Sequence, residues 1–167
     1  WFAHDVTVER RLKQTERDLR VFALLSENTP DGVAVLSPDG AFAYANEAYR
    51  ALTGHGQRLL QETVFDVHAE PRPAIDHALH QAFTTGTWEG PLTITPVEGR
   101  SIPCQVSFVR LPGGDAERGP SLAAIARDMT PFVEAERHRV ELQQQIIEAQ
   151  RAALSELSTP LLPLADG

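Results

Sequence analysis

The stretch Asp31–Asn46, with the sequence DGVAVLSPDGAFAYAN, decides the fold class of this chain. Residues 33–36 are short and strand-like, residues 37–40 (Ser-Pro-Asp-Gly) carry a turn signal, and residues 41–45 are again strand-like. Two short strands joined by a four-residue turn predict a β-hairpin. The globular part of the chain therefore begins with two antiparallel strands.

The pattern after the hairpin changes to that of helices and then returns to that of strands. The predicted helical segments are residues 46–52, 57–68 and 73–84, with glycines at 54, 56 and 86 as stop signals. The predicted late strands are residues 88–95, 101–111 and 122–126. This order of two strands, several short helices and three antiparallel strands predicts an α+β domain.

Both ends of the chain carry apolar residues at coiled-coil spacing. The N-terminal set is Val8, Leu12, Thr15, Leu19 and Phe22, and the C-terminal set is Val133, Val140, Ile147 and Leu154. A helix over 131–157 would be roughly 40 Å long, whereas a domain of about 100 residues has a radius of gyration of about 13 Å. An apolar face that stands clear in water needs a partner, so we expect a parallel homodimer. For residues 8–22, an amphipathic helix lying on its own domain stays an alternative.

Composition excludes several classes of function. The formal charge of −8, from 15 basic and 23 acidic residues, argues against a nucleic-acid surface. The single cysteine, Cys104, excludes an intramolecular disulfide and a Cys-rich metal site. No apolar stretch reaches the ~20 residues of a membrane span, and no signal-peptide pattern is present. We therefore expect a cytoplasmic protein without a membrane partner.

A short internal repeat marks two junctions between a strand and a helix. Residues 3–7 (AHDVT) match residues 126–130 (ARDMT), and a charged, seven-period segment follows each copy. The match suggests tandem copies of one domain type. Residues 1–7 would then end a preceding domain.

The motifs together resemble the PAS superfamily. They are Asp-Gly-Val at 31–33, Ser-Pro-Asp-Gly at 37–40, Tyr-Ala-Asn-Glu-Ala-Tyr at 44–49, Leu-Thr-Gly at 52–54, Gly-Thr-Trp-Glu-Gly at 86–90 and Asp-Met-Thr at 128–130. The resemblance implies a PAS domain over 24–130, between a linker helix (8–23) and a signalling helix (131–157). It also implies a five-stranded antiparallel sheet with helices on one face, flanked by coiled-coil helices.

In this family a ligand or partner is sensed between sheet and helices. The pocket candidates are Val35, Tyr44, Leu52, Leu60, Phe65, Ile75, Leu79, Phe83, Ile94, Val106 and Phe108. A plain hydrophobic core without ligand is the alternative. The resemblance also implies that Asp128 and Thr130 relay the change into the following helix. Thr130 suits a helix N-cap and Pro131 the first helical position.

Nothing in the sequence identifies a cofactor. Val64 occupies the position of the reactive cysteine of flavin-binding members, and Ile75 that of the haem-ligating histidine, so neither cofactor is expected. His77 and His80 suit a solvated helix surface. His68, His77, Glu70 and Asp76 lack the spacing of a zinc site, so no metal is expected. Catalytic motifs are missing, and we expect a protein that is not an enzyme.

The C-terminal segment Glu156–Gly167 (ELSTPLLPLADG) resembles the junction into a STAS domain of stressosome regulators. Residues 158–167 would then begin a STAS output domain, and the protein would be a sensor, relay and dimerisation module within a larger regulatory assembly. Residues 154–161 also resemble the phosphoacceptor box of a histidine kinase, with Ser155 at the histidine position. A ligand-free dimerisation spacer and the sensor part of a kinase are the alternatives.

Overall fold

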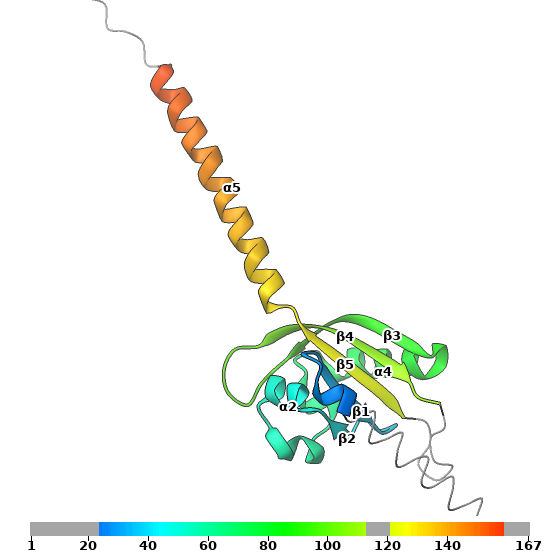
Figure 1. Cartoon of the computed structure of the whole chain (residues 1–167). Coiled ribbons are helices and arrows are strands. Elements are labelled where there is room, and N and C mark those ends of the chain that lie inside the picture. Colours follow the sequence, from blue (N-terminus) through cyan, green and yellow to red (C-terminus); the bar gives the residue numbers. More distant parts are fainter. Residues whose placement is uncertain (1–23, 113–120, 159–167) are drawn as a thin grey trace, which may run out of the picture. The chain divides into compact units, whose positions relative to one another are not determined.

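The computed structural model describes residues 24–112 and 121–158 (Figure 1). The expected linker helix at 8–23, with Val8, Leu12, Leu19 and Phe22, lies outside these ranges, as do residues 1–7 and 159–167. The chain divides into two units at the peptide bond between Met129 and Thr130. Each unit is described by itself.

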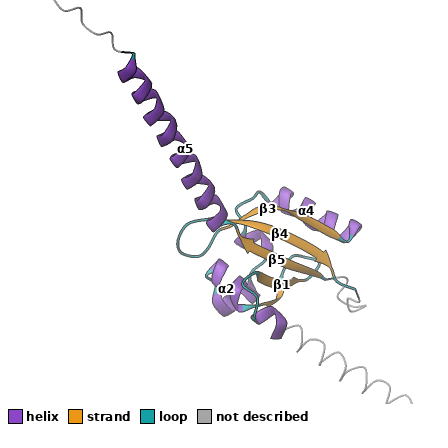
Figure 2. Ribbon diagram, turned by 45° about the horizontal axis from the view of Figure 1, so that its top comes forward, coloured by secondary structure: helices purple, strands orange, loops and turns teal. Residues whose placement is uncertain are grey.

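Five antiparallel strands form one sheet in the order β2-β1-β5-β4-β3 (Figure 2). The strands are β1 (Gly32–Leu36), β2 (Phe42–Ala45), β3 (Thr87–Ile94), β4 (Ile102–Arg110) and β5 (Leu122–Asp128). The predicted hairpin is β1–β2, and its turn is closed by the Gly40 amide, which donates to the Ser37 carbonyl at 2.9 Å. This architecture confirms the α+β class and the five-stranded antiparallel sheet.

Four short helices connect β2 to β3, and local signals set their ends. They are α2 (Glu47–Thr53), the 3-10 helix η1 (Gly56–Gln61), α3 (Val64–Val67) and α4 (Arg72–Thr85). Asn46 caps α2 by accepting a hydrogen bond from the Tyr49 amide, and the Thr63–Asp66 capping box starts α3. Gly54 and Gly86 end α2 and α4 in the left-handed region, at φ of 68° and 96°, which glycine adopts without strain.

The core lies between one face of the sheet and these helices. Strand residues alternate in burial, so that Ala34 and Leu36 of β1 are fully buried and Val33 and Val35 point to the other face. Helix α4 packs against β3 and β4, and α2 packs against β1. The largest fully buried side chains are Tyr49, Phe108, Leu36, Leu59, Ile75, Ile94, Leu122, Val64, Val67 and Val106.

Strand β3 contains a glycine that makes room for an aromatic ring. Trp88 stacks on Phe108 of β4, with ring centroids 5.4 Å apart and 26° between the planes. The same indole covers Gly90, where a Cβ atom would lie only 2.7 Å from Trp88 Cζ2. Packing therefore explains the second glycine of the Gly-Thr-Trp-Glu-Gly motif, because a side chain at position 90 would displace the indole ring of Trp88.

The second unit contains α5 (Thr130–Leu157), a helix of 28 residues without a buried side chain. Its apolar residues, including Val133, Val140, Ile147 and Leu154, are exposed. Within the described ranges, no helix combines the length and apolar character that a membrane span requires.

Replacing Gly90 by alanine tests the packing of Trp88. We expect Gly90→Ala to lower the free energy of unfolding by about 1–3 kcal/mol, since the indole must leave its place on Phe108. Denaturant unfolding followed by tryptophan fluorescence measures the change. Glu89→Ala, at the exposed neighbouring position, should stay within about 0.5 kcal/mol. Equal stabilities of the two variants would contradict this account.

Candidate functional site

Most of the predicted pocket residues lie in or against the core. Ile75, Leu79, Ile94, Val106 and Phe108 are buried. Leu52, Phe65 and Phe83 are partly buried and pack on the same cluster. Val64 and Ile75, at the positions where flavin- and haem-binding members carry their reactive residues, are both fully buried apolar side chains.

Three of the predicted pocket residues do not face the core. Leu60 is 46% exposed, and its neighbour Leu59 is buried instead, because η1 turns once in three residues and shifts the expected helical phase. Val35 and Tyr44 are cross-strand partners on the opposite face of the sheet, since Ala34 and Leu36 occupy the inner positions of β1. The assignment of Leu60, Val35 and Tyr44 to an interior pocket was therefore wrong.

The core holds polar atoms whose hydrogen-bonding capacity is not used. Tyr49 Oη, both ring nitrogens of His68 and Glu70 Oε2 are buried and have no hydrogen-bond partner among the described residues. Glu70 Oε1, by contrast, accepts the Thr93 amide at 2.8 Å. His68 forms an isolated bridge with Ile94, and the Ala69 amide donates to the Thr93 carbonyl at 2.9 Å, so this loop runs along the edge of β3. Buried polar atoms without partners are rare in native proteins, and each of them calls for an explanation, such as an ordered water or ion or a functional role.

Burial keeps the side chains of Tyr49, His68 and Cys104 neutral near pH 7. Burial lowers the pKa of His68 to about 4, although the Glu70 carboxylate and the nearby backbone of Thr93 act in the opposite direction. Burial also raises the pKa of Cys104 to about 11, with Asp128 and Glu70 adding to the effect, and it raises the pKa of Tyr49, with Cys104 adding to it. At neutral pH the core thus offers a phenol, an imidazole and a thiol, all uncharged. The buried, protonated Cys104 is a weak nucleophile.

Neither predicted surface histidine belongs to this group. His77 and His80 are exposed on α4. Within residues 24–112 and 121–158, no three His, Cys, Asp or Glu side chains gather as a metal site. From the sequence, His68 and Glu70 are considered only as metal ligands, because their place in the core results from the pairing of their loop with β3.

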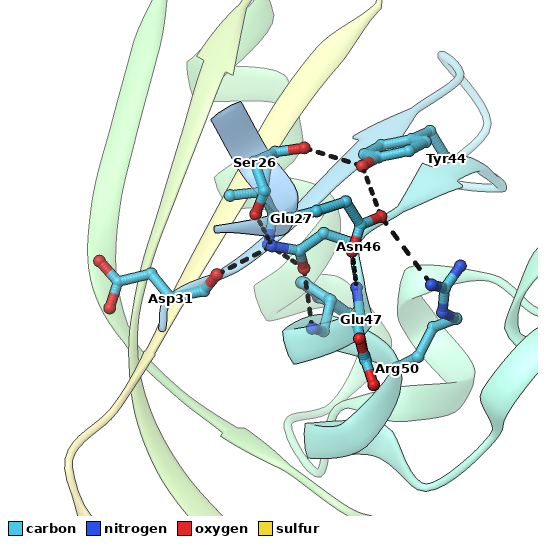
Figure 3. Close-up of polar contacts among 9 residues, drawn as sticks. Ser26, Glu27, Asp31, Tyr44, Asn46, Glu47 and Arg50 are labelled. Atoms are coloured by element: carbon cyan, nitrogen blue, oxygen red, sulfur yellow. Dashed lines mark hydrogen bonds and ion pairs between the residues drawn. The ribbon is translucent and has the colours of Figure 1, made fainter. Parts of the chain in front are cut away.

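Asn46 is a fully buried polar residue whose hydrogen bonds are satisfied (Figure 3). Its Nδ2 donates to the carbonyls of Ser26 at 2.6 Å and of Asp31 at 3.1 Å. Its Oδ1 accepts the amides of Val33 at 2.8 Å and of Tyr49 at 2.9 Å. One side chain thus joins the segment before β1, the beginning of β1 and the first turn of α2.

The segment before β1 has further polar anchors (Figure 3). Ser26 Oγ and Tyr44 Oη share a hydrogen bond of 2.8 Å. The Glu27 carboxylate accepts the Tyr44 hydroxyl at 3.1 Å and the Glu47 amide at 2.9 Å, and Arg50 Nη2 lies 3.9 Å from it. Tyr44 therefore anchors this segment on β2 instead of lining the core.

A two-point ion pair connects the beginning of β1 to the end of β5. Arg127 Nε and Nη2 donate to the two carboxylate oxygens of Asp31 at 3.1 and 2.8 Å. This fork geometry holds both side chains in one orientation. The predicted relay residues follow directly, with Asp128 as the last residue of β5 and Thr130 as the first of α5.

The burial of His68 predicts a loss of stability in acid. The unfolded chain binds a proton at this histidine below about pH 6.5, whereas the folded chain binds it only below about pH 4. We expect the free energy of unfolding to fall between these values by up to about 3 kcal/mol on account of His68. Urea unfolding at pH 7, 5.5 and 4 measures the free energy of unfolding at each pH. In His68→Phe we expect this free energy to change less steeply with pH than in the parent chain. His77→Gln is the exposed control, and an equal slope in His68→Phe would refute the prediction.

Comparison with known proteins agrees with this fold. The family model described as PAS fold matches residues 26–134, which is more than half of the chain. A search of the curated proteins found no match.

Solved structures with the same fold share little sequence with the chain. A PAS domain from a two-component sensor histidine kinase has a TM-score of 0.58 at 18% identity, over 68% of this chain and 98% of that one. The PAS domain of an HTR-like protein from Haloarcula marismortui has a TM-score of 0.57 at 21% identity, over 72% and 98%. An RNA-binding light-oxygen-voltage receptor has a TM-score of 0.57 at 19% identity, over 74% and 36%. With its five-stranded sheet, its helices and the match over residues 26–134, the chain belongs to the PAS family.

Proposed function

We propose that this chain is a sensor and signal-relay module that detects a small polar molecule in its core and passes the change to an output domain. The observation that supports sensing most directly is the group of unpartnered atoms on Tyr49, His68 and Glu70. A core that only filled space would gain stability by replacing such groups with apolar ones. Their presence in a PAS domain therefore favours a binding role over a spacer.

The chemistry of the group indicates the kind of molecule. Neutral imidazole and phenol can each donate and accept a hydrogen bond, and the free Glu70 oxygen only accepts. A carboxylate or phosphate would be repelled by Glu70. We therefore expect a ligand without negative charge, or a water cluster, that donates at least one hydrogen bond.

Replacing Tyr49 by phenylalanine separates sensing from a ligand-free spacer. If a bound molecule contacts the hydroxyl, Tyr49→Phe should lose about 1 kcal/mol of stability, and the mass of the bound molecule should disappear from native mass spectra. Tyr44→Phe is the matched control, because its hydroxyl bonds to Ser26 and Glu27 on the outer face. A Tyr49→Phe variant that is more stable than the parent, with no bound mass in either, would favour the spacer.

We further propose that α5 pairs with α5 of a second copy. Val133, Val140, Ile147 and Leu154 form an unbroken apolar column at seven-residue spacing, and each is between 40% and 64% exposed. Gln143 and Gln150 flank the column on one side and Arg137 and Arg151 on the other. This column supplies one of the two core positions of a heptad, and Gln143 and Gln150 occupy the other, so the two-stranded coiled coil that we propose would be a weak one.

A lysine in the apolar column tests the dimer. We expect Ile147→Lys to raise the dimer dissociation constant at least about tenfold, because a charge at the seam must be desolvated. Sedimentation equilibrium over a concentration series measures it. Gln145→Lys is the matched control, since residue 145 lies about 200° around the helix from Ile147. A parent chain that stays monomeric at every concentration would disprove this pairing.

The remaining parts of the proposal concern output and location. The resemblance of residues 156–167 to a STAS junction supports a STAS output domain in a stressosome-like regulator, a cytoplasmic location and no catalytic activity of the chain itself. The structural similarity to a PAS domain from a sensor histidine kinase supports the kinase alternative. Ser155, however, occupies the position at which a histidine kinase carries its phosphoaccepting histidine. In the parent protein, alternating strands and helices after residue 167 would support STAS, whereas a helical hairpin before an ATP-binding domain would support a kinase.

A further inference from the structure

We propose that a polar bridge of Asn46, Asp31 and Arg127 couples the segment before β1 to the end of β5, so that this domain also relays signals that arise upstream of it. This inference rests on the proposed relay function, and it adds a second input. The coupling uses none of the unpartnered core atoms. The domain would then connect two neighbours in series as well as respond to its own ligand.

The first step of the bridge fixes the incoming segment. Ser26 is buried, and its carbonyl accepts Asn46 Nδ2 at 2.6 Å. The Glu27 carboxylate holds the same segment on the Glu47 amide at 2.9 Å and on the Tyr44 hydroxyl at 3.1 Å. A movement of residues 26–27 therefore has to move Asn46 or break these bonds.

The second step leads from Asn46 to β1. The same Nδ2 atom that holds Ser26 also donates to the Asp31 carbonyl at 3.1 Å. The Val33 amide, 2.8 Å from Asn46 Oδ1, fixes the strand on the other side. Because the same amide group binds the carbonyls of Ser26 and Asp31, a change in its orientation alters its hydrogen bond to Asp31.

The third step crosses from β1 to the outgoing strand. The Asp31 side chain is 21% exposed, and its two oxygens receive the Arg127 fork at 3.1 and 2.8 Å. The Arg127 side chain is 66% exposed, so this pair serves to position the strands more than to stabilise them. Asp128 ends β5 and the Met129 amide donates to the Pro103 carbonyl at 2.8 Å, immediately before α5 begins in the sequence.

The β1–β5 ladder offers a rival route. Gly32 pairs with Ala126, so backbone hydrogen bonds also join the two strands beside the ion pair. A decisive test must remove the side-chain bridge and leave the ladder in place. Arg127→Gln and Asp31→Asn both do so, because neither changes a backbone group.

Hydrogen–deuterium exchange of the whole chain, read at the amides of residues 126–129, tests the coupling. Glu27→Ala releases the incoming segment, and we expect it to speed exchange at 126–129 about threefold to tenfold. In the Arg127→Gln background, the same substitution should change exchange there less than twofold while still speeding exchange at residues 46–50. Asp31→Asn is the second bridge variant, in case Arg127→Gln folds poorly.

The control is Arg72→Gln, which removes another exposed ion pair, with Asp76 on α4. In that background, Glu27→Ala should keep its full effect at 126–129. An effect that persists undiminished in both bridge variants would assign the coupling to the ladder, and no effect in the parent chain would show that none exists. Either result overturns the proposal. Because the measurement involves neither ligand nor output domain, the sensing proposal and this one can fail independently.

Discussion

The hydrogen bonds of the buried Asn46 side chain are the constraint on which the rest of the structure depends. A primary amide without partners in an apolar interior would destabilise the fold, so all four of its bonds must form together. They can form only when the segment before β1, β1 itself and α2 are in place. This one residue therefore sets where the sheet begins and how α2 leaves the hairpin, and the core between them follows.

The buried polar side chains are of two kinds, those with all their hydrogen bonds formed and those with unused donors or acceptors. At Asn46 every donor and acceptor is used, which favours a single arrangement of the neighbouring segments. At Tyr49, His68 and Glu70 several polar atoms have no partner among the described residues, so hydrogen bonds do not fix the orientation of these atoms. The proposed sensing role would need both properties, because a ligand can shift only a region that has more than one arrangement, and the shift must then reach a rigid frame.

Much of the fold could be predicted from residues with local roles. Turn and cap residues such as Ser37–Gly40, Asn46 and Gly86 act within a few positions of themselves, so the hairpin and the helix ends follow from the sequence. The placement of β5 between β1 and β4 depends on the pairing of β1 with β5 over about ninety residues, which no local pattern in the sequence encodes. Leu60 was misplaced because a 3-10 helix changes the phase of burial. The burial of His68 and Glu70 depends on a loop that pairs with the edge of β3, which no local pattern encodes.

The pairing of Gly32 with Ala126 places the first residue of the sheet beside one of its last. Opposed residues in an antiparallel ladder are about 5 Å apart, so the chain enters and leaves the domain at nearly the same point. Such a module can be gained, lost or duplicated during evolution without a long spacer to rejoin the flanking segments. The architecture therefore suits the exchange of whole domains between genes, by which a new receptor can arise when one domain replaces another.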